Sequence, residues 1–345
     1  MLDNTRKITI IAEAGVNHNG SIDQALKLVD AAHNAGADII KFQLFQADAL
    51  AIPAAPKAAY QENSGSGESQ LSMLRKLELG VSAFRTIALH CAQRGIGFLI
   101  TPFDLPSIES LKNMGVGRVK IPSGEITNVP YLREVAKNRW DIILSTGMST
   151  LEEIAFALNV LENAGAGREN IALLHCTTEY PAPFKDVNLR ALTTLALTFP
   201  GMRVGYSDHT EGIAIPVAAA ALGAVIIEKH FTLSREMEGP DHKASLEPGE
   251  LAQMVRNIRQ VEAAMGDGIK RPASSETANR DVVRKSIVAS RSIAKGECLS
   301  EMNLTTKRPG TGLSAVFWDA IMGRPAPEPL EREQMVPVSW NDLTS

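Results

Sequence analysis

The sequence contains little cysteine: Cys91, Cys176 and Cys298 are the only three in 345 residues, and no Cys-x-x-Cys pair occurs. Three isolated cysteines cannot form a disulfide framework, which favours a reducing compartment. The chain also lacks an apolar run of membrane-spanning length. Its first residues, MLDNTRKITIIAEAG, do not resemble a signal peptide because the apolar run is short and Glu13 interrupts it. These absences predict a cytoplasmic protein without a membrane partner.

A surplus of basic charge is absent as well. The 35 Lys and Arg residues are outnumbered by 39 Asp and Glu residues, so the net charge is −4 and a nucleic-acid partner is not expected. Hydrophobic residues make up 44% and charged residues 21%, which is typical of a globular protein. The length favours one large domain followed by a smaller one.

Eight short apolar runs alternate with amphipathic segments. Most carry Ile, Val, Leu or Phe at adjacent positions, which is typical of strands that are buried on both faces of a parallel sheet. The expected strands are Ile8–Glu13, Ile39–Gln43, Gly97–Phe103, Arg118–Ser123, Asp141–Gly147, Ile171–Thr177, Met202–Asp208 and Val225–Phe231.

Helical patterns fill the gaps between these strands. Ser21–Ala35 begins at a serine N-cap and ends before Gly36, Ser82–Arg94 ends before Gly95 in the same way, and Ser149 with Glu152 fits a capping box. The expected helices are Ser21–Ala35, Ser82–Arg94, Ser149–Gly165, Gly212–Leu222 and Pro248–Met265. Eight strand–helix units over about 265 residues match an α/β fold of the (β/α)8 TIM-barrel type. The doubly wound open sheet is the alternative, but no Gly-x-Gly-x-x-Gly follows the first strand. Residues 47–79, which include NSGSGES, are expected to form a loop with a short helix near its end.

The pattern changes after residue 268. Residues 269–285 are polar and lack strand periodicity, so we interpret them as a linker. Residues 286–345 predict a small β-rich domain with Cys298 in its core. Such a domain has a marginal core, so it is expected to pack against its own barrel or a partner subunit. The expected domains are therefore 1–268, 269–285 and 286–345.

Polar side chains of catalytic type stand at the ends of nearly all expected strands. Because TIM-barrel active sites form at the C-terminal ends of the strands, these side chains are expected to share one pocket. Lys41 and Gln43 lie on one face of their strand, as do Glu228 and His230. Any one of them could be a surface or satisfied core residue, but eight equivalent positions favour a site. The residues are Glu13, Lys41, Gln43, Thr101, Lys120, Ser123, Ser145, Thr178, Ser207, His209, Glu228 and His230.

Two ligand sites follow from these positions. His209 and His230 end consecutive strands and suit a divalent metal, unless both are structural. His242 is a third candidate ligand without an assigned element. Lys41 and Lys120 are candidates to bind a phosphate or a carboxylate of a ligand. The alternative is that the two lysines pair with acidic side chains of the chain itself. The acidic residues expected near the histidines are Asp208, Glu228 and Asp241. Those expected near the lysines are Glu13 and Glu228. The hydroxyl groups expected around the lysines are those of Thr101, Ser123, Ser145 and Ser207.

Nine motifs follow one another along the barrel: AEAGVNHNG, IIKFQ, TPFD, VKIPSGE, ILSTGMS, LLHCTTEYPAP, GYSDHT, VIIEKHF and GPDHKASLEP. Together they resemble the sialic acid synthase family, which uses phosphoenolpyruvate to make neuraminic, legionaminic or pseudaminic acids. The tail, with KRPGTGL, is similar to the antifreeze-like β-clip (SAF) domain of the same family. The resemblance covers essentially the whole chain.

The resemblance implies a role for each candidate residue. His209 and His230 match the metal ligands, for Mn²⁺ or Mg²⁺. Arg308 matches an arginine that reaches into the partner's barrel to contact an acetamido group, which implies a domain-swapped homodimer. The expected catalytic residues are Glu13, at the reacting centre, with Lys41, Lys120 and Glu228. The positions that hold phosphoenolpyruvate are Lys41, Thr101, Lys120, Ser123, Ser145 and Ser207, and those that line the sugar side are Gln43, Tyr180, Glu228 and Asp241.

The acceptor sugar depends on finer differences. Many neuraminate synthases resemble CTNxYPTP where this chain has CTTEYPAP, so Thr178 replaces an asparagine and Glu179 adds a charge. GPDHKASLEP differs from the pseudaminate branch. The chain therefore resembles the legionaminate branch, which implies condensation of phosphoenolpyruvate with 2,4-diacetamido-2,4,6-trideoxymannose and water to give N,N'-diacetyllegionaminate and phosphate.

Three alternatives remain. The first is an N-acetylneuraminate synthase that uses N-acetylmannosamine. The second is a metal-dependent keto-acid sugar aldolase, which would need no phosphate site. The third is a non-catalytic carbohydrate-binding protein, which would leave the polar pocket unexplained.

Overall fold

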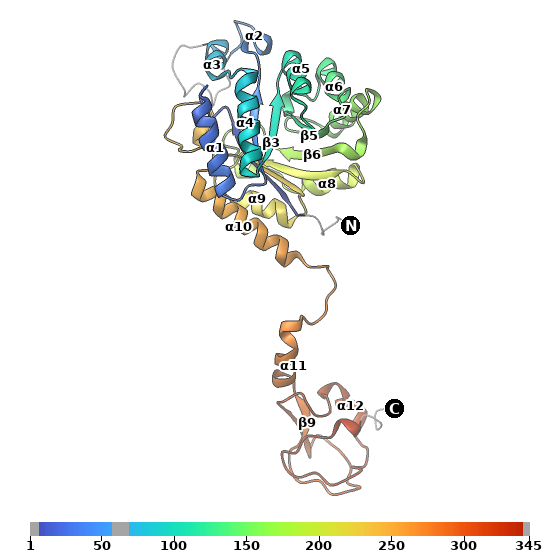
Figure 1. Cartoon of the computed structure of the whole chain (residues 1–345). Helices are drawn as coiled ribbons and strands as arrows, with labels where there is room; N and C mark the ends of the chain where they lie inside the picture. Colours follow the sequence, from blue (N-terminus) through green and yellow to red (C-terminus); the bar gives the residue numbers. More distant parts are fainter. Residues whose placement is uncertain (1–6, 57–68, 341–345) are drawn as a thin grey trace. The chain divides into compact units, whose positions relative to one another are not determined.

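The computed structural model describes residues 7–56 and 69–340 (Figure 1). The chain divides into two compact units, Met1–Asp267 and Gly268–Ser345. Most of the NSGSGES stretch lies outside the described residues.

The first unit is a barrel of parallel strands. Within the described residues, eight strands are hydrogen-bonded in the order β3-β2-β1-β8-β7-β6-β5-β4, and β3 contacts β4, which completes the ring. The predicted TIM barrel is confirmed, and each strand overlaps its expected range. The strands are β1 (Thr9–Gly15), β2 (Ile39–Leu44), β3 (Gly97–Pro102), β4 (Arg118–Ile121), β5 (Asp141–Ser145), β6 (Ile171–Cys176), β7 (Arg203–Asp208) and β8 (Ile226–His230).

A helix follows each strand and lies on the outside of the barrel (Figure 1). The sequence patterns predicted five of these helices and missed α5, α6 and α8. The described residues of the segment 47–79, which was expected to contain one short helix, contain two: α2 (Ala47–Leu50) and α3 (Gln70–Leu77). No described helix is both long and apolar enough to cross a membrane. The outer helices are α1 (Ile22–Asn34), α4 (Val81–Arg94), α5 (Leu105–Met114), α6 (Val129–Ala136), α7 (Leu151–Asn163), α8 (Ala191–Thr198), α9 (Ala214–Ala221) and α10 (Pro248–Met265).

The N-terminus of α7 corrects one local prediction. Thr150, and not Ser149, is the N-cap: its hydroxyl accepts the Glu153 N–H at 3.2 Å, and the Glu153 carboxylate accepts the Thr150 N–H at 2.8 Å. The pairs Ser149/Glu152 and Thr150/Glu153 both fit the capping-box spacing, so spacing could not distinguish them. Ser149 instead donates its hydroxyl proton to the Gly147 carbonyl.

The barrel interior has an apolar layer below a polar one. Seven inward-facing side chains from six strands, Ile11, Ile39, Leu99, Ile143, Ala172, Leu174 and Ile226, form an apolar cluster. Alternate residues of the strands face the helices and belong to the main core. Two residues beyond the apolar layer, the inward positions carry Glu13, Lys41, Thr101, Ser145, Cys176 and Glu228. The strand period of two therefore places the polar layer at the C-terminal ends.

The second unit has a small core of its own. β9 (Ser286–Ala289) pairs antiparallel with β10 (Leu304–Lys307), and isolated bridges extend the pairing. Buried residues such as Ile287, Leu299 and Leu330 pack together. Cys298 is exposed and does not belong to this core, which corrects the prediction. The polar stretch expected to be a linker contains α11 (Thr277–Val283), and a short helix, α12 (Trp318–Ile321), follows β10.

Candidate active site

A cavity of about 510 Å³ opens at the C-terminal ends of the barrel strands. Fourteen of the fifteen candidate site residues line it. Arg308, the fifteenth, belongs to the second unit, where it is exposed and donates its Nε–H to the Val283 carbonyl at 3.0 Å. The lining candidates are Glu13, Lys41, Gln43, Thr101, Lys120, Ser123, Ser145, Thr178, Tyr180, Ser207, His209, Glu228, His230 and Asp241.

The register of neighbouring strands places the candidate side chains at similar heights in the barrel. Glu13 on β1 lies opposite Lys41 on β2 and opposite His230 on β8. One inward position further along, Gln43 lies opposite Thr101 on β3. Register partners in a parallel sheet face the same side, so these side chains converge although they are far apart in the sequence.

Glu228 is the centre of a buried charge cluster. Its carboxylate accepts hydrogen bonds from Lys120 Nζ at 2.8 Å and Ser207 Oγ at 2.9 Å, and Lys41 Nζ lies 2.8 Å from its other oxygen. Lys41 Nζ also lies 3.2 Å from Glu13 Oε2. The two lysines therefore pair with Glu13 and Glu228, as the alternative interpretation expected. The pairs surround an open cavity, so an anion can replace a carboxylate as the partner of either lysine.

The pKa values in this cluster show that the charges are not evenly balanced. Burial raises the pKa of Glu13, and Glu228 adds to the rise against the pull of Lys41. Burial opposes ionisation of Glu228 as well, but Lys120 and Lys41 outweigh it and hold its pKa below the usual range. At Lys41, the carboxylates of Glu13 and Glu228 outweigh burial and raise the pKa of the ammonium group. At Lys120 burial outweighs the carboxylates and lowers the pKa of the ammonium group. Glu228 therefore stays ionised between the two lysines, and an anion can add a further negative charge to the cluster.

Three buried hydroxyls that line the cavity have no hydrogen-bond partner among the described residues: Thr101, Ser145 and Thr178. Leaving a buried hydroxyl unpaired costs about 1–3 kcal/mol, so a ligand that hydrogen-bonds to them would be stabilised. Ser123 differs, because its Oγ accepts the Gly147 N–H at 2.9 Å.

Gly147 permits this packing of hydroxyls. A Cβ atom there would lie 2.2 Å from Thr178 Oγ1, 2.9 Å from Ser123 Oγ and 3.0 Å from Cys176 Sγ. The first two separations are shorter than side-chain carbons adopt, so the loop after β5 needs a glycine to bring these groups together.

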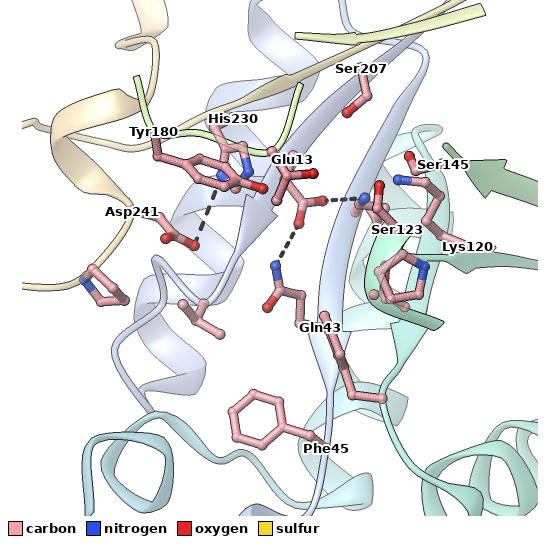
Figure 2. Close-up of a pocket in the computed structure, with 18 of the residues that line it drawn as sticks. Glu13, Gln43, Phe45, Lys120, Ser123, Ser145, Tyr180, Ser207, His230 and Asp241 are labelled. Atoms are coloured by element: carbon pink, nitrogen blue, oxygen red, sulfur yellow. Dashed lines mark hydrogen bonds and ion pairs between the residues drawn. The ribbon is translucent and has the colours of Figure 1, made fainter. Parts of the chain in front are cut away.

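Gln43 and Asp241 supply polar groups on another side of the cavity. Gln43 Nε2 donates to Glu13 Oε1 at 3.0 Å (Figure 2). Burial, with a smaller contribution from Glu13, raises the pKa of Asp241 to about 7. A carboxyl group that is half protonated near neutral pH can both donate and accept hydrogen bonds, which suits the hydroxyls and amides of a sugar.

His209 and His230 form an imidazole pair. Their ring centroids lie 5.5 Å apart, and both rings contact Tyr180. His209 Nδ1 bonds to the Thr177 carbonyl at 2.6 Å, which leaves its Nε2 for a ligand. His230 Nδ1 is buried without a hydrogen bond and lies 4.0 Å from Asp241 Oδ2 (Figure 2). Burial lowers the pKa of His209 to about 4 and that of His230 well below its usual value, so both are neutral at pH 7.

Neutral imidazoles with free nitrogen atoms fit a divalent cation. Within residues 7–56 and 69–340, no three His, Cys, Asp or Glu side chains gather as a ligand set. A cation held here would therefore have two protein ligands and take the others from water and substrate. Open positions of this kind are typical of catalytic metal sites.

Two other metal candidates from the sequence lie elsewhere. Asp208 pairs with Lys229 Nζ at 2.5 Å and does not line the cavity. Adjacent strand residues face opposite sides, and Asp208 follows an inward-facing serine, which explains the error. His242 is fully buried outside the cavity lining, between Thr232 Oγ1 at 2.7 Å and Asn19 Oδ1 at 3.2 Å.

The sequence reasoning missed the apolar side of the cavity. Phe45 carried a signal, because it stands two positions beyond Gln43, directly after the end of β2. The residues of α3 carried none, because their segment was interpreted mostly as a loop. The missed lining residues include Phe45, Leu50, Met73, Leu74, Leu77 and Phe103.

Comparison with known proteins identifies the family. The sequence profile of the NeuB family matches residues 28–270, and that of the SAF domain matches residues 284–344. The chain belongs to the NeuB family. The N,N'-diacetyllegionaminic acid synthase of Campylobacter jejuni is 53% identical over 96% of this chain and 99% of the relative. The protein of the same name from Legionella pneumophila is 46% identical over 91% and 89%.

A solved structure agrees with these relatives. The N-acetylneuraminic acid synthetase of Leptospira borgpetersenii, in complex with citrate, matches this NeuB-family chain with a TM-score of 0.70 and 35% identity, over 79% of this chain and 90% of that one. The predicted sialic acid synthase family, the barrel with a C-terminal SAF domain and the phosphoenolpyruvate-dependent synthase type of enzyme are confirmed. The substrates of this NeuB-family chain are phosphoenolpyruvate and an amino sugar.

Proposed function

We propose that this chain condenses phosphoenolpyruvate with 2,4-diacetamido-2,4,6-trideoxymannose and water to give N,N'-diacetyllegionaminate and phosphate. The observation that carries the proposal is the similarity over nearly the whole chain to two proteins named as synthases of that product, at 53% and 46% identity. Thr178 and Glu179 on the loop after β6 support the same acceptor, and Thr178 lines the cavity.

The phosphoenolpyruvate end of the cavity is the polar layer around Lys41 and Lys120. Their ammonium groups and the unpaired hydroxyls of Thr101 and Ser145 can hold the phosphate or the carboxylate of this substrate. Glu228 keeps both lysines in place through its two ion pairs before the anion arrives. Preorganised cations of this kind stabilise charge that moves onto the leaving phosphate.

His209 and His230 would hold a divalent cation, Mn²⁺ or Mg²⁺, through the nitrogen atoms described above. Such a cation acts as a Lewis acid toward a carbonyl oxygen. Asp241, whose Oδ2 lies 4.0 Å from His230 Nδ1, and Gln43 both line the cavity and would face the sugar.

The bond changes balance without a further reactant. C3 of phosphoenolpyruvate forms a bond to the aldehyde carbon of the open-chain sugar, whose oxygen takes up a proton. Water adds at C2 and loses its proton to Glu13, whose pKa burial raises toward the range of a general base. The C2–O bond to phosphate then breaks, a ketone forms at C2, and the proton of the C2 hydroxyl leaves with the phosphate. The proton that Glu13 accepted replaces the one that the aldehyde oxygen took up.

Phosphate release from phosphoenolpyruvate tests this proposal. With Mn²⁺ present, we expect the trideoxy sugar to give at least tenfold higher kcat/KM than N-acetylmannosamine. The reverse preference would make the chain an N-acetylneuraminate synthase. Conversion of a keto-acid sugar without phosphate release would make it an aldolase, and sugar binding without turnover would leave only the carbohydrate-binding alternative.

A second part of the proposal concerns Arg308. We propose that two chains form a domain-swapped homodimer in which Arg308 of each contacts the acetamido group bound in the other barrel. Arg308 is exposed on a unit with its own core, and its Nε bonds only to a backbone carbonyl, so the remaining guanidinium nitrogens can reach a ligand. Arg308→Ala is expected to raise the sugar KM and spare the phosphoenolpyruvate KM. Mixing it with inactive Lys120→Met should restore activity only if the arginine acts in the partner's site.

A further inference from the structure

One side of the cavity is lined mainly by apolar side chains, with Gln70 of α3 as a polar neighbour. Six apolar residues, Phe45, Leu50, Met73, Leu74, Leu77 and Phe103, form what we call the apolar wall. They belong, with Val16, to a hydrophobic cluster that is separate from the core between barrel and helices. The condensation chemistry uses none of them.

The Phe45 part of the wall lies past the C-terminal end of β2, beyond the level of Lys41 and Gln43. Lys41 and Gln43 alternate on the inward face of β2, about 7 Å apart, and Phe45 follows directly after the end of the strand and lines the same cavity. Figure 2 shows Gln43 between Glu13 and Phe45, with Lys120 and Ser145 on the other side of Glu13. A ligand that starts at the lysines and passes Glu13 therefore reaches Phe45 last.

The two substrates must lie along this line in a fixed order. Phosphoenolpyruvate occupies the lysine end, and the aldehyde carbon C1 of the sugar must meet it beside Glu13. The sugar chain then runs past Gln43, so its C6 end is the part nearest the wall. We infer that the apolar wall receives the C6 methyl group of a 6-deoxy sugar and selects it over a hydroxymethyl group. This inference rests on the function proposed above and assigns the residues that set one part of its specificity.

The selection follows from desolvation. A methyl group gains from contact with Phe45, Met73 and Leu77, whereas a hydroxyl at the same place loses its water and meets no polar atom of the wall. An apolar pocket discriminates against an added hydroxyl by about 10- to 100-fold. The same range is expected for kcat/KM here.

The wall offers a matched pair of variants on α3. Met73 and Leu71 are both 7% exposed, but Met73 lines the cavity and Leu71 does not. Met73→Gln puts an amide of similar length into the wall, and Leu71→Gln makes the same kind of polar change on the other side of the helix. Phe45→Tyr is a second test, which adds one hydroxyl and keeps the ring.

The experiment measures kcat/KM by phosphate release for two sugars that differ only at C6, the trideoxy sugar and its 6-hydroxy counterpart. We expect the wild type and Leu71→Gln to prefer the trideoxy sugar by 10- to 100-fold. Met73→Gln and Phe45→Tyr should reduce the preference to about threefold or less. A third sugar, with a hydroxyl in place of the 4-acetamido group, should be discriminated against equally by the wild type and Met73→Gln.

The outcomes separate the two proposals. Good turnover with an unchanged C6 preference in both wall variants overturns the inference and leaves the proposed function intact. Loss of preference in Leu71→Gln as well, or a change confined to the 4-acetamido comparison, also overturns it. Turnover of none of these sugars, with turnover of N-acetylmannosamine, refutes the proposed function and the inference with it.

Discussion

Replacing Glu228 by glutamine removes the negative charge at the centre of the buried cluster. The side chains of Lys41 and Lys120 are 5% and 4% exposed, so neither can recover its solvation in water. Glu13 remains near Lys41, but Lys120 loses the carboxylate with which it forms its ion pair. The variant therefore holds two buried ammonium groups with too little compensating charge.

The magnitude follows from what one uncompensated buried charge costs. Breaking a buried ion pair by removing one partner destabilises a protein by about 3–5 kcal/mol. Each kcal/mol shifts Tm by roughly 2–4 °C for a domain near this size. Glu228→Gln is therefore expected to lower Tm by roughly 6–20 °C in the absence of ligand. Inorganic phosphate should recover much of this loss, because it supplies the missing negative charge.

Thermal unfolding with and without phosphate measures both effects. Glu134→Gln is the control: Glu134 pairs with Lys137 at 2.6 Å on the surface of α6, where the two side chains are 34% and 63% exposed. Surface pairs contribute about 0–1 kcal/mol, so this variant should keep nearly the wild-type Tm. A Tm of Glu228→Gln within 2 °C of wild type, or equal stabilisation of both proteins by phosphate, would refute the reasoning.

Three further predictions concern other parts of the site. Gly147→Ala forces a Cβ against Thr178 Oγ1, so kcat/KM should fall sharply while stability drops by about 1–3 kcal/mol; wild-type activity would contradict this packing. His230→Ala should abolish Mn²⁺ binding to the protein alone in calorimetry, and unchanged binding would exclude the proposed metal site. Lys229→Met leaves Asp208 buried without its cation and should cost about 3–5 kcal/mol in urea unfolding, whereas adding Asp208→Asn should recover part of that loss.

The barrel was predictable because its signal is local and repeated. Runs such as Ile171–Leu174 are apolar on both faces, and Gly36 and Gly95 end their helices as expected. Length and capping do not explain why α6 and α8 were missed, because α9 also has 8 residues and no side-chain N-cap bond and was predicted. The capping box of α7 was off by one residue because two pairs fit the same spacing.

The candidate site was predictable as a set of positions, since strand ends meet at one face of a barrel. The directions of its side chains were not fully predictable. Asp208 was expected beside the histidines and instead pairs with Lys229, away from the cavity. His242 contacts Thr232 and Asn19, and no spacing in the sequence predicts these contacts.

The sequence by itself determined the strands, the family and the residue types at the strand ends, because these depend on short-range periodicity and ordered motifs. Tertiary structure alone decided which groups meet. Glu228 binds Lys41 and Lys120 only because barrel closure brings β8, β2 and β4 around one axis. The apolar wall exists only because α3 packs its Met73 side next to Phe45. Such contacts join residues from distant parts of the chain, and their partners are chosen by packing, which a linear pattern does not encode.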